Sequence, residues 1–248
     1  MWLSAGTEQA GERRSCELAY RTSAMVPTGP WRLPTEAERV LLDSHDRTET
    51  PRRAVAIVAM PAAAVEPLRA LAREVTPTPG GAPIRSPEAE ETMARAMEHV
   101  RAYLESTDDL AIQGVRVQVG GLTTSTAHPF PEGVVLIGMH VDRWHDGPYG
   151  CSEHAQLSIN LGAGDRYLAF ANLPVNELVH DYGDPIGGWL TIPSDFARRR
   201  GGYPVVRVRI GPGEAYLAPT ENLIHDVVLE SAATDVCFTL RGRLRLPG

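Results

Sequence analysis

The sequence predicts a mainly β protein with flanking helices, in which short strands form a sandwich or barrel. From about Leu110 onward, short runs of β-branched and apolar residues alternate with glycine, proline and aspartate turns. The 248 residues include 20 prolines and 23 glycines, a composition typical of an all-β core with many turns. We therefore predict an N-terminal irregular and helical region, residues 1–109, packed on a β core, residues 110–248, within one structural domain.

Composition narrows the class of protein. A hydrophobic content of 43% and a charged content of 22% are ordinary for a globular chain. The formal net charge of −7 argues against a sequence-independent grip on nucleic acid, which needs clustered positive charge. No apolar run approaches the ~20 residues that span a membrane, and no basic region followed by an apolar core opens the chain. With three widely spaced cysteines, these features favour a reducing, cytoplasmic setting without nucleic-acid or membrane partners.

The N-terminal region contains few local signals. Residues 1–33 show no periodicity, and we expect them to be irregular. Thr35 and Glu38 have the spacing of a capping box, which predicts a short helix through about Leu42. Next come a strand candidate at 53–60 and a helical apolar repeat at Val65, Leu68, Leu71 and Val75.

The clearest helix begins after Ser86. Ser86 can cap the helix, and Pro87 suits its first position because the backbone N–H that proline lacks would be unpaired there. One apolar face follows, which we expect to pack on a sheet, and its members are Met93, Met97, Val100 and Leu104.

The β core is predicted to hold roughly eight strands. Each candidate is a short apolar or β-branched run bounded by turn residues, as in a sandwich or barrel. The candidates are residues 115–119, 134–141, 156–161, 167–171, 189–192, 205–210, 215–218 and 236–240.

One short motif in this core suggests metal chemistry. His140 and Asp142 flank Val141 at the end of a strand-like run, and His225 follows far downstream after another such run. Residues two apart on a strand point the same way, so His140 and Asp142 can reach one ion. Two imidazoles and one carboxylate can bind iron(II) on one face and leave the other face open. The same three residues could also be unrelated, as a structural histidine, a turn aspartate and a surface histidine.

The order of these residues in a β setting resembles the iron(II)/2-oxoglutarate-dependent oxygenases. That family has a double-stranded β-helix core of the jelly-roll or cupin-like kind, and the resemblance covers roughly Leu110 to Leu246. It implies a catalytic iron held by His140, Asp142 and His225, with 2-oxoglutarate as co-substrate. The implied reaction converts 2-oxoglutarate and O2 to succinate and CO2, and a small molecule is hydroxylated. An amino acid or an intermediate of specialised metabolism is the expected substrate, and the presence of Asp142 argues against halogenation.

The resemblance also implies a basic residue that anchors the far carboxylate of 2-oxoglutarate on the strand after the last histidine. Arg241, 16 residues after His225, is the matching position, and Arg243 is the alternative on the same face. A guanidinium suits this role because it is permanently charged and can bind a carboxylate with two hydrogen bonds. Further candidates for contact with the 2-oxo acid are Thr239, Asn160 and Ser158.

The loop after the metal motif is a candidate substrate contact. Arg143 could meet a substrate carboxylate, and Trp144 or Tyr149 could stack on the substrate or shield it.

Two rival functions stay open at this point. A cupin-type metalloenzyme, either an isomerase or a dioxygenase that uses no 2-oxo acid, would share the β core and the metal site. A non-catalytic β-barrel binding module would have the three residues by accident. The sequence contains no G-x-S-x-G elbow, P-loop or dinucleotide fingerprint.

Overall fold

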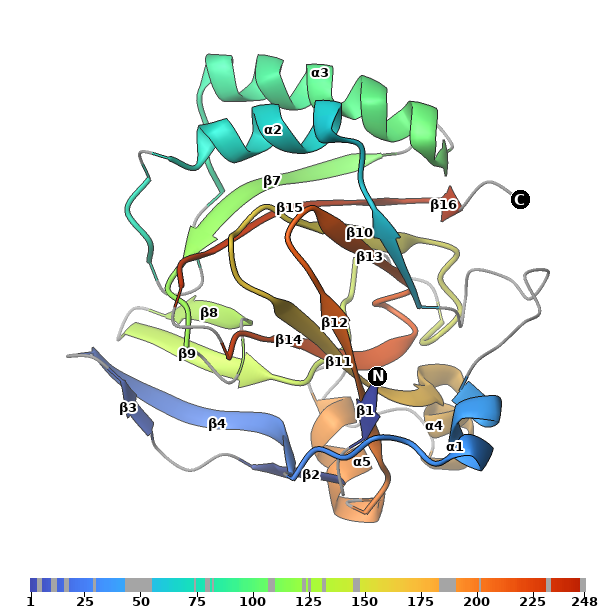
Figure 1. The fold of residues 1–248 in the computed structure, drawn as a ribbon. Helices are drawn as coiled ribbons and strands as arrows, with labels where there is room; N and C mark the ends of the chain where they lie inside the picture. Colours follow the sequence, from blue (N-terminus) through green and yellow to red (C-terminus); the bar gives the residue numbers. More distant parts are fainter. Residues whose placement is uncertain are drawn as a thin grey trace.

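The computed structural model has two facing antiparallel sheets flanked by helices (Figure 1). This confirms the predicted mainly β fold with flanking helices. The model describes residues 1–3, 6–9, 13–15, 18–28, 30–42, 55–73, 75–78, 81, 83–106, 110–121, 124, 126–130, 133–144, 148–182, 191–200, 202–230 and 233–245.

The larger sheet has five strands, and two helices cover its outer face (Figure 1). Buried side chains of the helices, such as Leu68 and Met97, pack against Leu157, Phe238 and Leu240 of the sheet. The strand order is β5 (Ala56–Ala59), β13 (Glu214–Ala218), β10 (Ala155–Asn160), β15 (Asp235–Gly242) and β7 (Ala111–Gln118), and the helices are α2 (Ala62–Leu71) and α3 (Pro87–Tyr103).

The α3 helix begins as its sequence predicts. The Ser86 side-chain oxygen accepts a hydrogen bond from the backbone N–H of Ala89 at 3.1 Å, and Pro87 occupies the first turn. Met93, Met97 and other apolar residues at helical spacing are then buried against the sheet.

The second sheet has four strands and lies across the cavity from the first. Leu168 and Val206 of this sheet pack against Tyr216 of the larger sheet, so an apolar core fills one side of the space between them. Two helices pack on its outer face, where Ala169 contacts the cluster around Phe196. The strand order is β1 (Trp2–Leu3), β12 (Val205–Ile210), β11 (Arg166–Pro174) and β14 (Leu223–Val228), and the helices are α4 (Val175–Tyr182) and α5 (Ile192–Arg200).

Smaller elements complete the described fold. A further sheet pairs β2 (Gly6–Gln9), β4 (Leu18–Thr28), β9 (Gly133–Gly138) and β8 (Ala127–Phe130), with β3 (Arg13–Ser15) on β4. The strands β6 (Glu105–Ser106) and β16 (Leu244–Arg245) pair with each other, and α1 spans Glu36–Leu42.

The expectation that residues 1–33 are irregular is wrong. Within this segment, β1 pairs with β12 and β4 pairs in parallel with β9. These strands depend on partners that lie far along the chain, and local periodicity cannot reveal such partners. The first 109 residues therefore contribute strands to the sheets as well as helices.

The predicted strand at 189–192 is also not confirmed. Residues 189 and 190 lie outside the described segments, and Ile192 begins the α5 helix. Its run of apolar residues is short, and such a run fits a buried helix as well as a strand. Among the described helices, none is long and apolar enough to cross a membrane.

Candidate metal centre

The β9 strand ends at a glycine just before the metal motif. The predicted strand over 134–141 ends at Gly138, whose φ of +76° is a left-handed conformation that favours glycine. His140 then forms an isolated bridge with His225 of β14, with N–O distances of 2.9 and 2.8 Å in the two directions. The bridge fixes the two histidines side by side, although they are far apart in the sequence.

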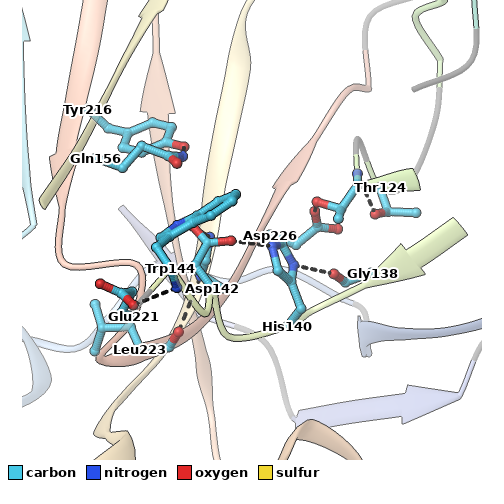
Figure 2. A network of polar contacts seen from close by, with 12 residues as sticks. Thr124, Gly138, His140, Asp142, Trp144, Gln156, Tyr216, Glu221, Leu223 and Asp226 are labelled. Carbon is cyan, nitrogen blue, oxygen red and sulfur yellow. Dashed lines mark hydrogen bonds and ion pairs between the residues drawn. The ribbon is translucent and has the colours of Figure 1, made fainter. Parts of the chain in front are cut away.

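His140, Asp142 and His225 converge on one point (Figure 2 shows His140 and Asp142). One ligand atom from each residue lies within 4.8 Å of the others. The distance from Asp142 Oδ1 to His140 Nε2 is 3.3 Å, and that from Asp142 Oδ2 to His225 Nε2 is 3.8 Å. The structure thus brings together the three residues predicted to bind iron.

Backbone carbonyls orient both imidazoles for metal binding. The Nδ1 atom of His140 lies 2.9 Å from the Gly138 carbonyl oxygen, and that of His225 lies 3.2 Å from the Leu223 carbonyl oxygen. A carbonyl only accepts, so each Nδ1 carries a hydrogen, and each Nε2 is the atom that a metal would bind.

Burial and mutual contact set the charges of the three ligands. Burial lowers the pKa of His225 to about 4, with help from repulsion by His140, so this imidazole is neutral at neutral pH. Burial alone would raise the pKa of Asp142, but the His140 hydrogen bond and both imidazoles hold it well below its usual range. The site therefore offers two nitrogen donors and one anionic oxygen donor, a set that suits iron(II) with open positions.

The three candidate ligands open onto a polar cavity of about 190 Å³ between the two sheets. Side chains from both sheets and from the loop after the motif line it. Besides the three ligands, the lining residues are Gln113, Arg116, Gln118, Thr126, Trp144, Gln156, Ser158, Arg166, Tyr216, Val227, Cys237 and Thr239.

Arg166 is the most deeply buried cation on the cavity wall. Its Nε atom lies 2.8 Å from Asp235 Oδ1, and its Nη1 donates to the Ser158 hydroxyl at 3.1 Å. Burial opposes its charge, but Asp235 more than compensates, so the pKa of Arg166 is above its ordinary value. Gln118 also donates to Asp235, at 2.6 Å, which holds that carboxylate in place.

A second arginine lies near Arg166. Arg116 of β7 is directly opposite Cys237 of β15, and both residues line the cavity. Burial raises the pKa of the Cys237 thiol, and two cations, Arg166 and Arg116, and one anion, Asp235, lie close enough to act on it, so the charge around this residue is positive on balance. Such a region can bind the carboxylate of a small acid.

The predicted 2-oxoglutarate anchor, Arg241, lies beside the cavity and not among the residues that line it. Arg241 shares the inner face of β15 with Thr239, but it is not among the cavity-lining residues, and its guanidinium lies 3.9 Å from the centre of the Trp144 ring. The alternative, Arg243, is exposed and lies 3.8 Å from a carboxylate oxygen of Glu153, away from the cavity.

The other predicted contacts divide into two groups. Thr239 and Ser158 line the cavity, with 3.3 Å between their hydroxyl oxygens. Asn160 does not line it, because its side chain binds the backbone around the β10 end instead. Its amide nitrogen donates to the carbonyls of Gly164 and Ile210, and its oxygen accepts from the Gly162 N–H.

The loop after the metal motif is held by a buried turn before β14. The backbone N–H of Trp144 donates to Glu221 at 2.8 Å (Figure 2), and the Ser152 hydroxyl donates to the same carboxylate at 2.6 Å. Trp144 lines the cavity and is 44% exposed, whereas the Arg143 guanidinium stacks 4.4 Å from the Tyr149 ring centre. Of the three predicted substrate residues, only Trp144 is therefore at the cavity.

The sequence analysis did not identify Arg166, Glu221 or Tyr216 as residues of the site. Arg166 directly precedes the predicted strand at 167–171 and shares a face with its apolar residues, which was a usable signal for a buried cation. Tyr216 is buried, and burial raises its pKa to about 12, so it keeps its hydroxyl proton. Glu221 lies in a polar turn, which ordinarily indicates exposure.

Comparisons with known proteins find likenesses in structure only. No family model matches the chain, and no curated protein matches it. Among solved structures, AviO1 from Streptomyces viridochromogenes is similar over 83% of this chain and 97% of its own, with 15% identity and a TM-score of 0.45. HygX from Streptomyces hygroscopicus, with nickel, 2-oxoglutarate and hygromycin B bound, is similar over 84% and 87%, with 12% identity and a TM-score of 0.36.

A third similar structure is the Kdo hydroxylase KdoO, a non-heme Fe(II) α-ketoglutarate-dependent dioxygenase in complex with cobalt(II). It is similar over 79% of this chain and 82% of its own, with 11% identity and a TM-score of 0.40. The solved structures similar to this chain thus include members of the oxygenase class that the sequence resembles. At these identities and TM-scores, the likeness assigns no activity to this chain, so its function has to be inferred from its own residues.

Proposed function

We propose that this protein is an iron(II)-dependent oxygenase that uses 2-oxoglutarate and acts on a small polar molecule. The observation that carries the proposal is the convergence of His140, Asp142 and His225 at a cavity with cationic walls. Two imidazole nitrogen donors and one carboxylate on one face leave room for a chelating co-substrate and for dioxygen. Iron bound there with the 2-oxo acid would supply dioxygen activation and the oxidation of a nearby C–H bond.

The residues of this chain would hold the parts of the reaction in place. The carbonyls of Gly138 and Leu223 fix the imidazole Nε2 atoms toward the ion. Asp142 offsets part of the metal charge without filling the open side. Trp144 covers the edge of the cavity and limits the access of water.

We assign the far carboxylate of the co-substrate to Arg166, with Arg116 beside it. Both arginines line the cavity, whereas Arg241 stacks on Trp144 outside its lining. Arg166 is already fixed by Asp235 and Ser158, so little side-chain entropy is lost when it binds a ligand. Asp235 offsets part of the charge of Arg166, and Arg116 keeps the net charge of this part of the cavity positive. Thr239 adds a hydroxyl on the same wall.

The cavity lining also favours a polar substrate. Apart from Trp144, Val227 and Cys237, the lining side chains carry amide, hydroxyl, imidazole or charged groups. Tyr216 accepts a hydrogen bond from Gln156 at 2.6 Å and keeps its own proton for a ligand. A substrate with hydroxyl or charged groups can satisfy these donors and acceptors, whereas a hydrocarbon would leave them unpaired.

The test is anaerobic reconstitution with iron(II), followed by 2-oxoglutarate. We expect a visible metal-to-ligand charge-transfer band, and succinate formation when oxygen is admitted. Asp142→Ala is the control, and it should bind little iron and give no band. Iron binding without the band would favour the cupin-type alternative, and no iron binding would contradict both enzyme functions.

A further inference from the structure

Arg241 has a buried donor without a partner. The Nη1 atom of Arg241 is buried and has no hydrogen-bond partner in the described part of the chain. Among the described residues, no carboxylate is recorded within 4.0 Å of its guanidinium, unlike Arg166, which lies against Asp235. A buried guanidinium N–H is costly to leave unpaired, so an arginine in this state indicates a ligand that completes it.

The surroundings of Arg241 show where that ligand would lie. Cys237, Thr239 and Arg241 alternate along the inner face of β15, and the first two line the cavity. Arg241 is directly opposite Gln156 of β10, which also lines the cavity. Arg241 thus continues the cavity wall toward the exposed ring of Trp144, and we call this pair of residues the mouth pair.

The geometry of the mouth pair selects the kind of ligand. The Trp144 ring covers one face of the guanidinium at 3.9 Å and leaves its edge N–H groups for a partner in the plane. The Trp144 backbone N–H donates a 2.8 Å hydrogen bond to Glu221, and this bond fixes the position of the backbone that carries the ring. An in-plane pair of N–H donors with a permanent charge matches a carboxylate or a phosphate.

Cavity size separates this ligand from the co-substrate. A cavity of about 190 Å³ is smaller than the roughly 300–1,000 Å³ typical of pockets for drug-sized ligands. A bound dicarboxylate would occupy much of it, so a second molecule has to extend toward the mouth. The mouth pair lies there, on the side of the loop that follows the metal ligand Asp142.

We propose that the mouth pair, Arg241 with Trp144, binds an anionic group of the primary substrate, a carboxylate or a phosphate. This rests on the proposed oxygenase function and adds the substrate class to it. Binding of the anion pairs the buried N–H of Arg241 and holds the rest of the substrate over the open side of the metal centre.

The experiment uses the full chain loaded with iron(II) and 2-oxoglutarate without oxygen. Acetate and inorganic phosphate are the anion probes, and acetamide is the neutral control. Binding is followed by tryptophan fluorescence and by the shift of the charge-transfer band. We expect the wild type to bind at least one anion and not acetamide, and the stronger anion identifies carboxylate or phosphate as the group recognised.

Arg241→Gln should lower the anion affinity by about tenfold or more, because a charge-assisted hydrogen bond is lost. Its affinities for iron and 2-oxoglutarate should stay unchanged. Arg243→Gln is the matched control, since it removes an exposed arginine two residues away, and it should bind anions as the wild type does. Trp144→Leu keeps the guanidinium but loses the stacked ring, so we expect a loss of about threefold.

Two results would overturn the inference, and a third would overturn the proposed function instead. If Arg241→Gln weakens 2-oxoglutarate binding instead, Arg241 anchors the co-substrate, and the oxygenase function stands. If the anions bind wild type and variant equally, or bind neither, the mouth pair is no anion site. If the wild type gives no charge-transfer band, the proposed function fails, and the same titrations on iron-loaded protein decide alone whether Arg241 binds an anion.

Discussion

The two faces of the five-stranded sheet differ in chemistry although the same strands build them. On β15, Phe238 and Leu240 point to the helices and are fully buried in an apolar cluster. Cys237 and Thr239 point the other way and line the cavity. The alternation of side chains along a strand allows one segment to serve both faces.

The difference teaches how stability and binding are divided. The helix face buries apolar side chains, which stabilise the fold in proportion to the area removed from water. The cavity face buries polar groups, each of which needs a partner or a ligand. Substitutions on the first face should therefore mainly change unfolding, and substitutions on the second should mainly change binding.

The largest expected effect is on the helix face. Phe238→Ala should lower the free energy of unfolding by about 3–5 kcal/mol, because a fully buried ring is replaced by a void. Urea denaturation measures this change. Iron titration of the protein that remains folded should give the wild-type affinity, and a parallel loss of iron affinity would show that the two faces are coupled.

On the cavity face, Arg166→Gln should weaken 2-oxoglutarate binding by roughly 10- to 100-fold, since charged hydrogen bonds contribute about 1.5–3 kcal/mol. Titration of the charge-transfer band measures the affinity. Arg166→Lys keeps the positive charge but loses the paired N–H donors of the guanidinium, so its 2-oxoglutarate affinity should lie between those of the wild type and Arg166→Gln.

Arg69 provides the matched arginine on the other face. It belongs to α2 and donates to the Leu161 carbonyl at 2.9 Å. Arg69→Gln should leave 2-oxoglutarate affinity unchanged. Equal losses in the Arg69 and Arg166 variants would mean that the cavity arginine acts only through stability.

A bulge in β7 sets the register between β7 and β15, and a substitution at this bulge can test its contribution to stability. Gly114 has a φ of +104°, and the β7–β15 pairing shifts beside it. Gly114→Ala should cost about 1–2 kcal/mol, because an L side chain strains this backbone. Gly202→Ala is the control, since an added Cβ there meets nothing within 4 Å, and thermal unfolding should separate the two variants.

The smallest expected effect is that of Thr239→Val, which keeps the shape and removes the hydroxyl. Ser158 retains its bond from Arg166, so the loss in unfolding free energy should be below about 1 kcal/mol. The 2-oxoglutarate affinity should fall only a few-fold. A loss as large as that of Arg166→Gln would make Thr239 a principal contact.

Much of the local structure could be predicted from the sequence. The apolar spacing and the Ser86 cap indicated α3, and β-rich runs indicated β10, β11, β12, β13 and β15. The β1 and β4 strands could not be recognised, because their partners lie far along the chain. The candidate metal motif could be recognised because His140 and Asp142 lie two residues apart and imidazole and carboxylate groups are common metal ligands.

The sequence by itself determined the candidate pair His140 and Asp142 and the two-faced strands, since both follow from residue types at short spacing. Only the tertiary structure decided that His225 is bridged to His140 and that Arg166, and not Arg241, is among the residues that line the cavity. Which cation reaches a cavity depends on the register of strands in two sheets and on where each strand ends. Those are long-range properties, because they arise from pairing and packing between segments far apart in the chain.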